Sequence, residues 1–368
     1  MKPLLKWPGG KSSEIVRFRT MIPGFDRYFE PFFGGGALYF HLCPPKAAVN
    51  DLSGDLMAFY RLVQAQDPEL EAYLRAYAWS FRRLVALGER QGERLLALLP
   101  AQEEAPERET VSALLDSWQD ELARLFDPPL APDLADFWAE LEHSLLDKVT
   151  RTVRHQAVQP FSRNDLLENL ITGLTGGYYL YFRRLYNEAA AGKLDLSPAA
   201  RMANFYFIRE MCYGSMFRYN AKGEFNIPYG GMSYNRKDLL SKVEAIFSPA
   251  VAELFAGTAL YSMDFEDFLR ETAPTERDFL FLDPPYDTEF SNYEGAAFTK
   301  LDHARLAVAL SRTPAKFLLI IKNTDFIQAL YSQGFHVWRF DKQYAYNVRS
   351  RNDRAAEHLI VTNYALQL

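Results

Sequence analysis

The sequence predicts an α/β fold in which a doubly wound, Rossmann-like sheet is interrupted by a mainly helical insertion. Short apolar runs typical of buried strands alternate with helical patterns towards both ends of the chain. Strands that alternate with helices form parallel sheets, because each parallel pair needs a crossover connection. Residues 66–170 show helical spacing broken by prolines, and we expect them to lie within the connections of that sheet.

The first strand is expected over residues 27–32, which lead into three glycines at positions 34–36. Glycine accepts positive φ and lets the backbone approach a ligand closely. The three glycines therefore predict a tight turn, with a helix from about Ala37. The pattern differs from GxGxxG, so a dinucleotide is not the expected ligand.

A second short strand is predicted at residues 47–49, and it ends at Asp51. A carboxylate at the end of the second strand, shortly after a glycine turn, suits the ribose hydroxyls of an adenosine-containing ligand. Asp264 and Phe265 form a second acidic and aromatic pair, which would suit an adenine ring and its amino group. Helix N-capping is the alternative for both aspartates.

The C-terminal part of the chain contains three further apolar runs. Residues 279–282, 317–321 and 358–362 each predict a buried strand. Helical patterns at 301–310 and 326–333 fall between them, which is typical of a doubly wound sheet.

The strand at 279–282 is followed by Asp283, Pro284, Pro285 and Tyr286. Open α/β sheets bind ligands at the carboxyl ends of their strands. Prolines have no N–H group, so this turn offers carboxylate and carbonyl acceptors with few donors. Acceptors beside an aromatic ring suit the exocyclic amino group of a nucleobase that stacks on the ring. An ordinary strand-ending turn is the alternative.

The N-terminal residues 6–11 read KWPGGK and combine a ring, two glycines and two ammonium groups. They lack the strand and the spacing of the phosphate loop of a nucleotide triphosphatase. Trp7 and Lys11 are expected to fold over a ligand that carries an aromatic base and a carboxylate; a surface-packed N-terminus is the alternative. The six histidines lack the spacing of a zinc deaminase, so no metal is expected.

The charge distribution leaves nucleic acid open as a partner, although the formal net charge is −6. Residues 66–170 hold 20 acidic and 11 basic residues, so the remainder of the chain is positively charged overall. Residues 201–242 hold 7 basic and 3 acidic residues. A phosphate backbone responds to such a local surface rather than to total charge. Two cysteines exclude a disulfide framework, and no apolar run is long enough to span a bilayer.

Two basic clusters are candidates for contact with DNA. Arg218, Asn220 and Lys222 lie in the polar stretch 217–230, and Arg and Asn side chains can read guanine and adenine edges. Arg349 and Arg351 belong to a second cluster, for which we expect phosphate contacts. Solvated charges on a hairpin or a loop are the alternatives.

Together these motifs resemble those of the Dam-type DNA adenine-N6 methyltransferases. The resemblance covers roughly residues 1–65 and 171–368, whereas residues 66–170 exceed what a minimal member carries. The family's Asn-Gly pair is missing before residue 217, so the sequence does not give the target site. The stretches that carry the resemblance are residues 6–11, 30–36, 50–51, 217–230, 264–265, 283–286 and 355–364.

The resemblance implies a methyltransferase sheet, a target-recognition region within the insertion, and S-adenosyl-L-methionine as methyl donor without a metal. Residues 1–65 and 256–368 are then expected to form the donor-binding catalytic domain. Residues 66–255 would form the inserted helical and target-recognition region, with 66–170 as an extra acidic helical insert. The implied donor-binding residues are Trp7, Lys11, Phe32, Gly34, Gly36, Asp51, Asp264, Phe265 and Asp283.

The residues also predict how the reaction would proceed. The amino nitrogen of adenine is a poor nucleophile, and Asp283 with the Pro284 carbonyl can accept its two hydrogens. Direct transfer to a base flipped out of double-stranded DNA, with Tyr286 stacked on it, is therefore expected. Cytosine-N4 methylation and a non-catalytic DNA- or partner-binding role on the same scaffold are the alternatives.

The expected partners are double-stranded DNA and, through residues 66–170, a cognate restriction enzyme or another subunit. We expect a monomer in the cytoplasm, associated with the nucleoid of a prokaryote or a phage host, and no membrane. The target sequence and the role of the insert do not follow from the sequence.

Overall fold

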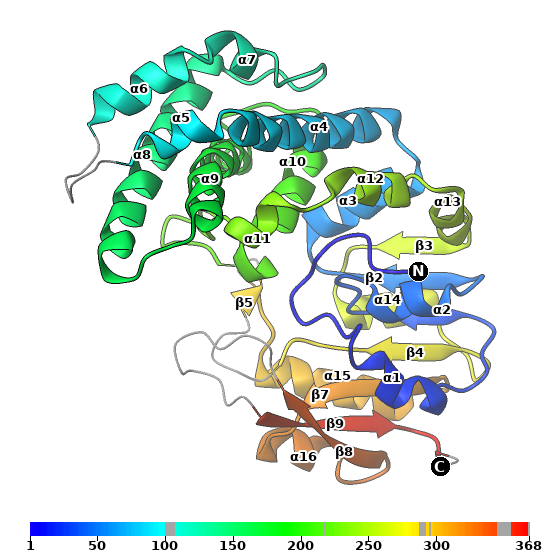
Figure 1. Ribbon diagram of the computed structural model, residues 1–368. Coiled ribbons are helices and arrows are strands. Elements are labelled where there is room, and N and C mark those ends of the chain that lie inside the picture. The colour runs from blue at the N-terminus through cyan, green and yellow to red at the C-terminus, as the bar shows by residue number, and fades with distance from the viewer. Residues whose placement is uncertain (100–106, 217, 287–291, 294–295, 344–354, 367–368) are drawn as a thin grey trace. The chain divides into compact units, whose positions relative to one another are not determined.

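The structure is a computed structural model that describes residues 1–99, 107–216, 218–286, 292–293, 296–343 and 355–366 (Figure 1). The chain forms two compact units. Met1–Gln64 and Pro249–Leu368 make up the first, and Ala65–Ser248 make up the second. The helical unit is thus contiguous in sequence, while the other is assembled from both ends of the chain. The expected functions of these units remain predictions.

The first unit is built on a mixed sheet of seven strands in the order β3-β2-β1-β4-β7-β9-β8 (Figure 1). The strands from β3 to β7 in this order are parallel to their neighbours. The seven strands are β1 (Tyr28–Glu30), β2 (Ala47–Asn50), β3 (Thr258–Tyr261), β4 (Phe279–Leu282), β7 (Lys316–Lys322), β8 (His336–Gln343) and β9 (Ala355–Thr362).

The expectation of an all-parallel sheet is wrong for β9, which is antiparallel to both β7 and β8. Only the short segment 344–354 separates β8 from β9. A parallel return needs a dozen or more residues, so this connection is too short for one. The apolar runs correctly predicted β4, β7 and β9, whereas β3 and β8 were not predicted.

The strand order places a topological switch point between β1 and β4. From β1 the chain proceeds to β2 on one side, and from β4 it proceeds to β7 on the other. Parallel strands end at a common edge, so the segments that follow β1, β2, β3 and β4 meet there. This edge is where open α/β sheets bind ligands.

Apolar side chains from the strands and the helices form the core of the first unit. All four residues of β4 are buried, as are the five central residues of β7, and Phe268, Leu306 and Ile327 bring the helices into the same core. The helices of this unit are α1 (Ile15–Phe18), α2 (Ala37–Leu42), α3 (Gly54–Gln64), α13 (Pro249–Ala256), α14 (Phe265–Thr272), α15 (Lys300–Arg312) and α16 (Asp325–Tyr331), with a 3₁₀ turn η1 (Arg19–Met21). A separate two-stranded ribbon joins β5 (Asn292–Tyr293) to β6 (Ala296–Ala297).

The second unit is helical, as expected for residues 66–170, but its longest helix runs through residue 170 without a break. Asp67, Asp133 and Ser162 cap its long helices by accepting from backbone N–H groups. The helices are α4 (Pro68–Arg90), α5 (Gly92–Leu96), α6 (Arg108–Asp116), α7 (Gln119–Ala123), α8 (Leu134–Val158), α9 (Arg163–Ala190), α10 (Pro198–Met211), α11 (Met232–Asn235) and α12 (Leu239–Ile246), with η2 (Tyr213–Ser215).

Candidate active site

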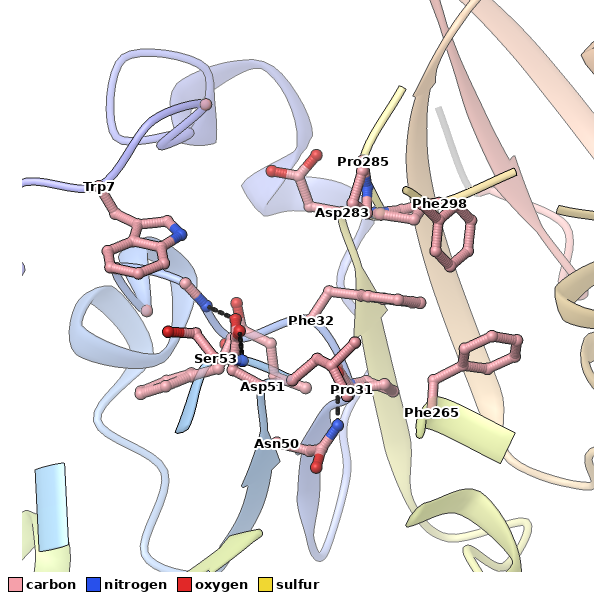
Figure 2. A pocket seen from close by; sticks show the side chains of 18 of the residues that line it. Trp7, Pro31, Phe32, Asn50, Asp51, Ser53, Phe265, Asp283, Pro285 and Phe298 are labelled. Carbon is pink, nitrogen blue, oxygen red and sulfur yellow. Dashed lines mark hydrogen bonds between the residues drawn. The ribbon is translucent and has the colours of Figure 1, made fainter. Parts of the chain in front are cut away.

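A cavity of about 310 Å³ lies at the switch point of the sheet in the first unit. Figure 2 shows Trp7 and Asp51 at one end of it, phenylalanine rings at the other, and Asp283 at its rim. Its volume is at the lower end of the range typical of small-molecule sites. The cavity brings together every residue for which the sequence predicted donor binding: Trp7, Lys11, Phe32, Gly34, Gly36, Asp51, Asp264, Phe265 and Asp283.

The glycine turn after β1 is shaped by contacts that leave no room for side chains. Gly34 has φ +50°, and a Cβ at this position would lie 2.7 Å from Cδ1 of Trp7. Gly36 has φ +62°, and a Cβ there would lie 2.6 Å from the ring of Phe33. Both glycines line the cavity, and the space that their side chains would fill is taken by the rings of Trp7 and Phe33.

Asp51, just after β2, ties the ends of two strands together. Its Oδ2 accepts from the backbone N–H of Gly34 at 2.8 Å, and its Oδ1 accepts from the N–H of Ser53 at 2.9 Å. Burial raises the pKa of the Asp51 carboxyl, and these two hydrogen bonds oppose the shift. The hydroxyl of Ser53 accepts from Leu56 N–H at 3.3 Å, so Ser53 rather than Asp51 caps α3.

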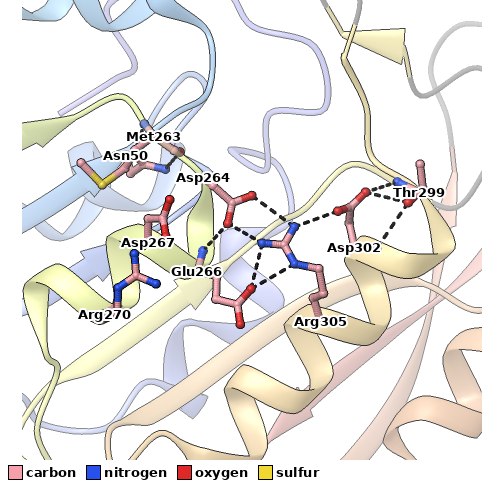
Figure 3. A network of polar contacts seen from close by, with 9 residues as sticks. All are labelled: Asn50, Met263, Asp264, Glu266, Asp267, Arg270, Thr299, Asp302 and Arg305. Carbon is pink, nitrogen blue, oxygen red and sulfur yellow. Dashed lines mark hydrogen bonds and ion pairs between the residues drawn. The ribbon is translucent and has the colours of Figure 1, made fainter.

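Asp264 both caps α14 and enters a network of charged groups (Figure 3). Its Oδ1 accepts from Glu266 N–H at 2.9 Å and from Nη2 of Arg305 at 2.7 Å. Arg305 also binds Glu266 and Asp302, at 2.8 Å and 3.0 Å. The N-cap alternative is thus realised without removing Asp264 from the cavity.

Three phenylalanines form the apolar end of the cavity (Figure 2). The ring of Phe32 lies 5.5 Å from that of Phe265 and 5.5 Å, edge to face, from that of Phe298. The guanidinium of Arg305 lies over one face of the Phe265 ring, 4.9 Å from its centre, and helps to hold the ring in place. This arrangement offers a flat apolar ligand both ring faces and ring edges.

Lys11 connects the N-terminal segment to the turn after β4. Its Nζ donates to both oxygens of Asp283, at 2.6 Å and 2.5 Å, and to the hydroxyl of Tyr286 at 2.9 Å. A further bond to the carbonyl of Gly9, at 3.0 Å, closes the loop. The Lys11 side chain is 2% exposed and that of Asp283 is 18% exposed. The sequence predicted that both residues serve a ligand but not that they pair with each other.

Glu30, at the end of β1, is a buried carboxyl in the lining of the cavity. Burial raises its pKa well above the ordinary value, the hydrogen bond from the Tyr28 hydroxyl at 2.7 Å opposes this, and the charges of Asp283 and Asp51 add to it. Burial and the two neighbouring acidic groups thus favour the neutral form of the Glu30 carboxyl by raising its pKa. Sequence reasoning missed Glu30 as a titrating group, and it also missed Phe298 and Arg305.

The candidate DNA-contacting residues of the second unit lie on a hairpin that follows η2. Arg218 donates from Nε to Oδ1 of Asn226 at 3.0 Å. Oδ1 of Asn220 accepts from the N–H groups of Lys222 and Glu224, at 2.9 Å and 3.0 Å. Asn220 thus shapes the tip of the hairpin, while Arg218 and Lys222 are exposed. Arg349 and Arg351 lie outside the described residues.

The described residues also bear on other classes of function. They contain no group of three or more His, Cys, Asp or Glu side chains placed to hold a metal ion. Among the described helices, none combines the length and apolar character needed to cross a lipid bilayer.

The profile of the D12 class N6 adenine-specific DNA methyltransferases matches residues 7–84 and 158–346 of this chain. The chain belongs to this family. The matched ranges contain every residue that lines the cavity, as well as the hairpin. The family description agrees with the expectation of adenine-N6 rather than cytosine-N4 methylation. The unmatched residues 85–157 fall within the acidic insert.

Named relatives of this D12 class methyltransferase extend over nearly the whole chain. The Type II methyltransferase M.CviBI of Paramecium bursaria Chlorella virus NC1A is 24% identical over 99% of this chain and 100% of its own length. The Type II methyltransferase M.MjaIII of Methanocaldococcus jannaschii is 25% identical over 99% of each chain. The DNA adenine methylase of Vibrio cholerae is 27% identical over 88% of this chain and 82% of its own.

Proposed function

We propose that this DNA adenine methyltransferase binds S-adenosyl-L-methionine in the cavity and acts on the N6 amino group of an adenine flipped out of double-stranded DNA. When bound, the donor supplies the methyl group. One observation carries the proposal: Asp283 stands at the carboxyl end of β4, in the same cavity as the Gly34 turn and Asp51. The groups for a nucleoside ligand and for an amino group are therefore adjacent.

The residues present fit the chemistry of the donor. Each oxygen of Asp51 accepts one backbone N–H, and a carboxylate oxygen has a further lone pair that can accept a ribose hydroxyl. Phe32, Phe265 and Phe298 provide an apolar environment for an adenine ring. At Gly34 the space that a side chain would fill is occupied by the ring of Trp7, which packs against the glycine turn in the lining of the cavity.

The proposed role of the Asp283 turn is to orient the target amino group. The lone pair of this nitrogen is delocalised into the ring, so the nitrogen is a weak nucleophile. Acceptance of its two hydrogens by Asp283 and the Pro284 carbonyl favours a tetrahedral nitrogen and stabilises the positive charge that develops on it. Pro285 ends the strand, and Tyr286 offers its ring for stacking.

Lys11 preorganises this turn before the base arrives. It holds both oxygens of Asp283 and the hydroxyl of Tyr286, so one ammonium fixes the plane of the carboxylate and the position of the ring. The target base must leave the duplex to reach these groups, at an unstacking cost of about a few kcal/mol. Contacts with the flipped base and with the DNA backbone offset that cost.

The first experiment is long-read sequencing of genomic DNA from a methylation-free host that expresses the protein. We expect N6-methyladenine in one sequence motif, and none with Asp283→Ala. The control is Glu276→Ala, an exposed position shortly before the same strand, which should methylate normally. Methylation by the Asp283→Ala protein would refute the role of this turn. If the wild-type protein leaves DNA unmodified, a failure to bind S-adenosylhomocysteine would identify a non-catalytic scaffold.

We further propose that the two units divide the task. Residues 1–65 and 256–368 would hold the donor and the reacting groups, and residues 66–255 would recognise the target. Arg218 and Lys222, exposed on the hairpin, are the proposed base or phosphate contacts, and Asn220 would act through the shape of the tip. Arg349 and Arg351 are proposed as phosphate contacts. A lower salt dependence of DNA affinity in Lys222→Ala would support a phosphate contact.

For assembly, we propose a monomer in the cytoplasm that associates with the nucleoid. Residues 66–170 would provide the surface for a cognate restriction enzyme or another subunit, in line with the Type II names of several relatives. Sedimentation equilibrium of the purified protein tests the monomer. Coexpression with the neighbouring gene products, followed by co-purification, tests the partner.

A further inference from the structure

On the returning strand of the hairpin, every second residue forms backbone hydrogen bonds with the preceding segment of the chain. Asn226 N–H donates to the carbonyl of Arg218 at 3.2 Å, and the carbonyl of Pro228 accepts from Tyr213 N–H at 2.9 Å. The backbone groups of the alternate residues, Phe225 and Ile227, point to the opposite side. Both residues are buried as a whole, so their backbone groups require partners other than water.

Side chains of helix α9 supply these partners. In a β-sheet, the backbone of a third strand would supply them. Asn187 donates from Nδ2 to the carbonyl of Phe225 at 3.1 Å and accepts from the N–H of Phe225 at 2.8 Å. The carbonyl of Ile227 accepts from the Tyr179 hydroxyl at 2.8 Å and from Nη1 of Arg183 at 3.0 Å. The amide of Asn187 thus pairs with the strand as another strand residue would.

The spacing of these residues places them in one row. Thr175, Tyr179, Arg183 and Asn187 recur at every fourth position of α9 and therefore share one face of the helix. Thr175 extends the row, because its hydroxyl donates to Oδ1 of Asn235, 2.8 Å away, which also accepts from the Tyr229 hydroxyl. We call these four residues of α9 the polar ladder.

The polar ladder is connected through Asn226 to Arg218, the residue proposed to read a base of the target site. Asn226 lies between Phe225 and Ile227, the two residues that the polar ladder holds, and its Oδ1 accepts from Nε of Arg218. A shift of the returning strand would therefore displace the Arg218 guanidinium. Recognition of a guanine edge by two hydrogen bonds does not tolerate such a shift.

We propose that the polar ladder of α9 sets the position of the hairpin and thereby determines how sharply the enzyme discriminates its target site from related sites. This rests on the proposed role of the hairpin in target recognition. Because Tyr179, Arg183 and Asn187 of the polar ladder bind main-chain groups, they hold the hairpin independently of which side chains the hairpin presents. The polar ladder positions the reading residues and does not itself touch DNA.

The test compares Asn187→Ala with Asn169→Ala, a control on the same helix whose amide donates to the carbonyl of Asp165 within α9. Methylation rates are measured on a duplex with the motif found by genomic sequencing and on duplexes with one base pair changed. For Asn187→Ala we expect the ratio of motif to changed-site kcat/KM to fall about tenfold or more. S-adenosylhomocysteine affinity should stay unchanged, and Asn169→Ala should match the wild-type protein.

An unchanged ratio in Asn187→Ala would overturn the proposal. Tyr179→Phe, which removes one hydroxyl donor to Ile227, replaces it if Asn187→Ala does not fold, and the same criterion applies.

A double-mutant cycle tests whether the polar ladder acts on target recognition through Arg218. If the reader is Arg218, Asn187→Ala should cost no further selectivity in an Arg218→Ala background. Full additivity would overturn the path through Asn226. If Arg218→Ala alone keeps wild-type selectivity while Asn187→Ala lowers it, the proposed role of Arg218 fails and the positioning role of the polar ladder stands.

Discussion

Arg305 determines the positions of several side chains at the apolar end of the cavity. One guanidinium binds Asp264, Glu266 and Asp302 (Figure 3), and it also lies over the Phe265 ring. The sequence predicted that Asp264 and Phe265 bind the adenine of the donor. Both are held in place by Arg305, which was not predicted as a site residue. The Arg305 side chain is about one-third exposed, so its ion pairs add little net free energy of folding. Its main effect is to position the side chains that it contacts.

Arg305→Met should weaken binding of S-adenosylhomocysteine by about 1–2 kcal/mol, roughly five- to thirty-fold, because Asp264 and Phe265 lose their common support. Calorimetric titration measures this. Arg270→Met is the matched control, since Arg270 pairs with Asp267 on the outer face of the same α14 region (Figure 3). Equal affinities of the two variants would show that Arg305 does not position the pair.

Glu30 makes the stability of the enzyme depend on pH. Its pKa is raised by burial, so the folded protein keeps a proton that the unfolded chain releases above the ordinary range of a glutamate. The stability is complete at pH values below that range and falls as the pH rises towards the raised pKa, by at most about 1.4 kcal/mol per pH unit.

Glu30→Gln should remove this slope, because an amide does not titrate. Urea unfolding at pH 5 and pH 8 should show a smaller loss of stability on going to pH 8 for the variant than for the wild-type protein. The opposite order would mean that Glu30 is ionised in the folded protein.

At the scale of elements, α8 and α9 pack closely because α9 carries glycines at the contact. A Cβ on Gly177 would lie 2.8 Å from Cα of Leu141 and 2.9 Å from the carbonyl oxygen of Glu140. Both are backbone atoms, which cannot rotate away. The approach of the two helices thus depends on the missing side chain, and α9 also carries the polar ladder.

Gly177→Ala should destabilise the protein by about 1–3 kcal/mol through overpacking, despite the better helix propensity of alanine. Gly54→Ala, in α3, is the control: a Cβ there meets no atom within 4 Å, so propensity alone should act and stability should stay equal or rise. Thermal unfolding of both variants distinguishes the effects. A stabilised Gly177→Ala protein would show that the helices can separate at no cost.

At the scale of the whole molecule, the two units differ in how the chain builds them. Ala65–Ser248 is one continuous segment, whereas the first unit needs both ends of the chain. The second unit has a core of its own, in which the rings of Tyr77, Phe182 and Phe207 lie within 6 Å of one another.

The fragment 65–248 should therefore fold alone into a helical, cooperatively unfolding protein that does not bind S-adenosylhomocysteine. Circular dichroism during urea unfolding measures the first property and calorimetry the second. The full-length protein serves as the reference for both. A fragment without a cooperative transition would show that the second unit depends on the first.

The sequence alone determined those features that depend on local order. Apolar runs ended by proline or glycine predicted β4 and the turns after β1 and β4, because strand burial and turn chemistry are encoded by neighbouring residues. Their order along the chain placed Asp51 and Asp283 at the carboxyl ends of strands, and the resemblance gave the family and the reaction. The family match confirms that reaction.

Only the tertiary structure decided which side chains meet across long separations. The pairing of Lys11 with Asp283, 272 positions apart, and the clamp of Arg305 on Asp264 have no local pattern, because each needs elements from different parts of the chain. The antiparallel direction of β9 likewise depends on hydrogen bonds between distant backbone groups, and the position of the hairpin depends on hydrogen bonds from side chains of α9 to its backbone. Periodicity describes a residue's own element, whereas these contacts depend on how the elements pack.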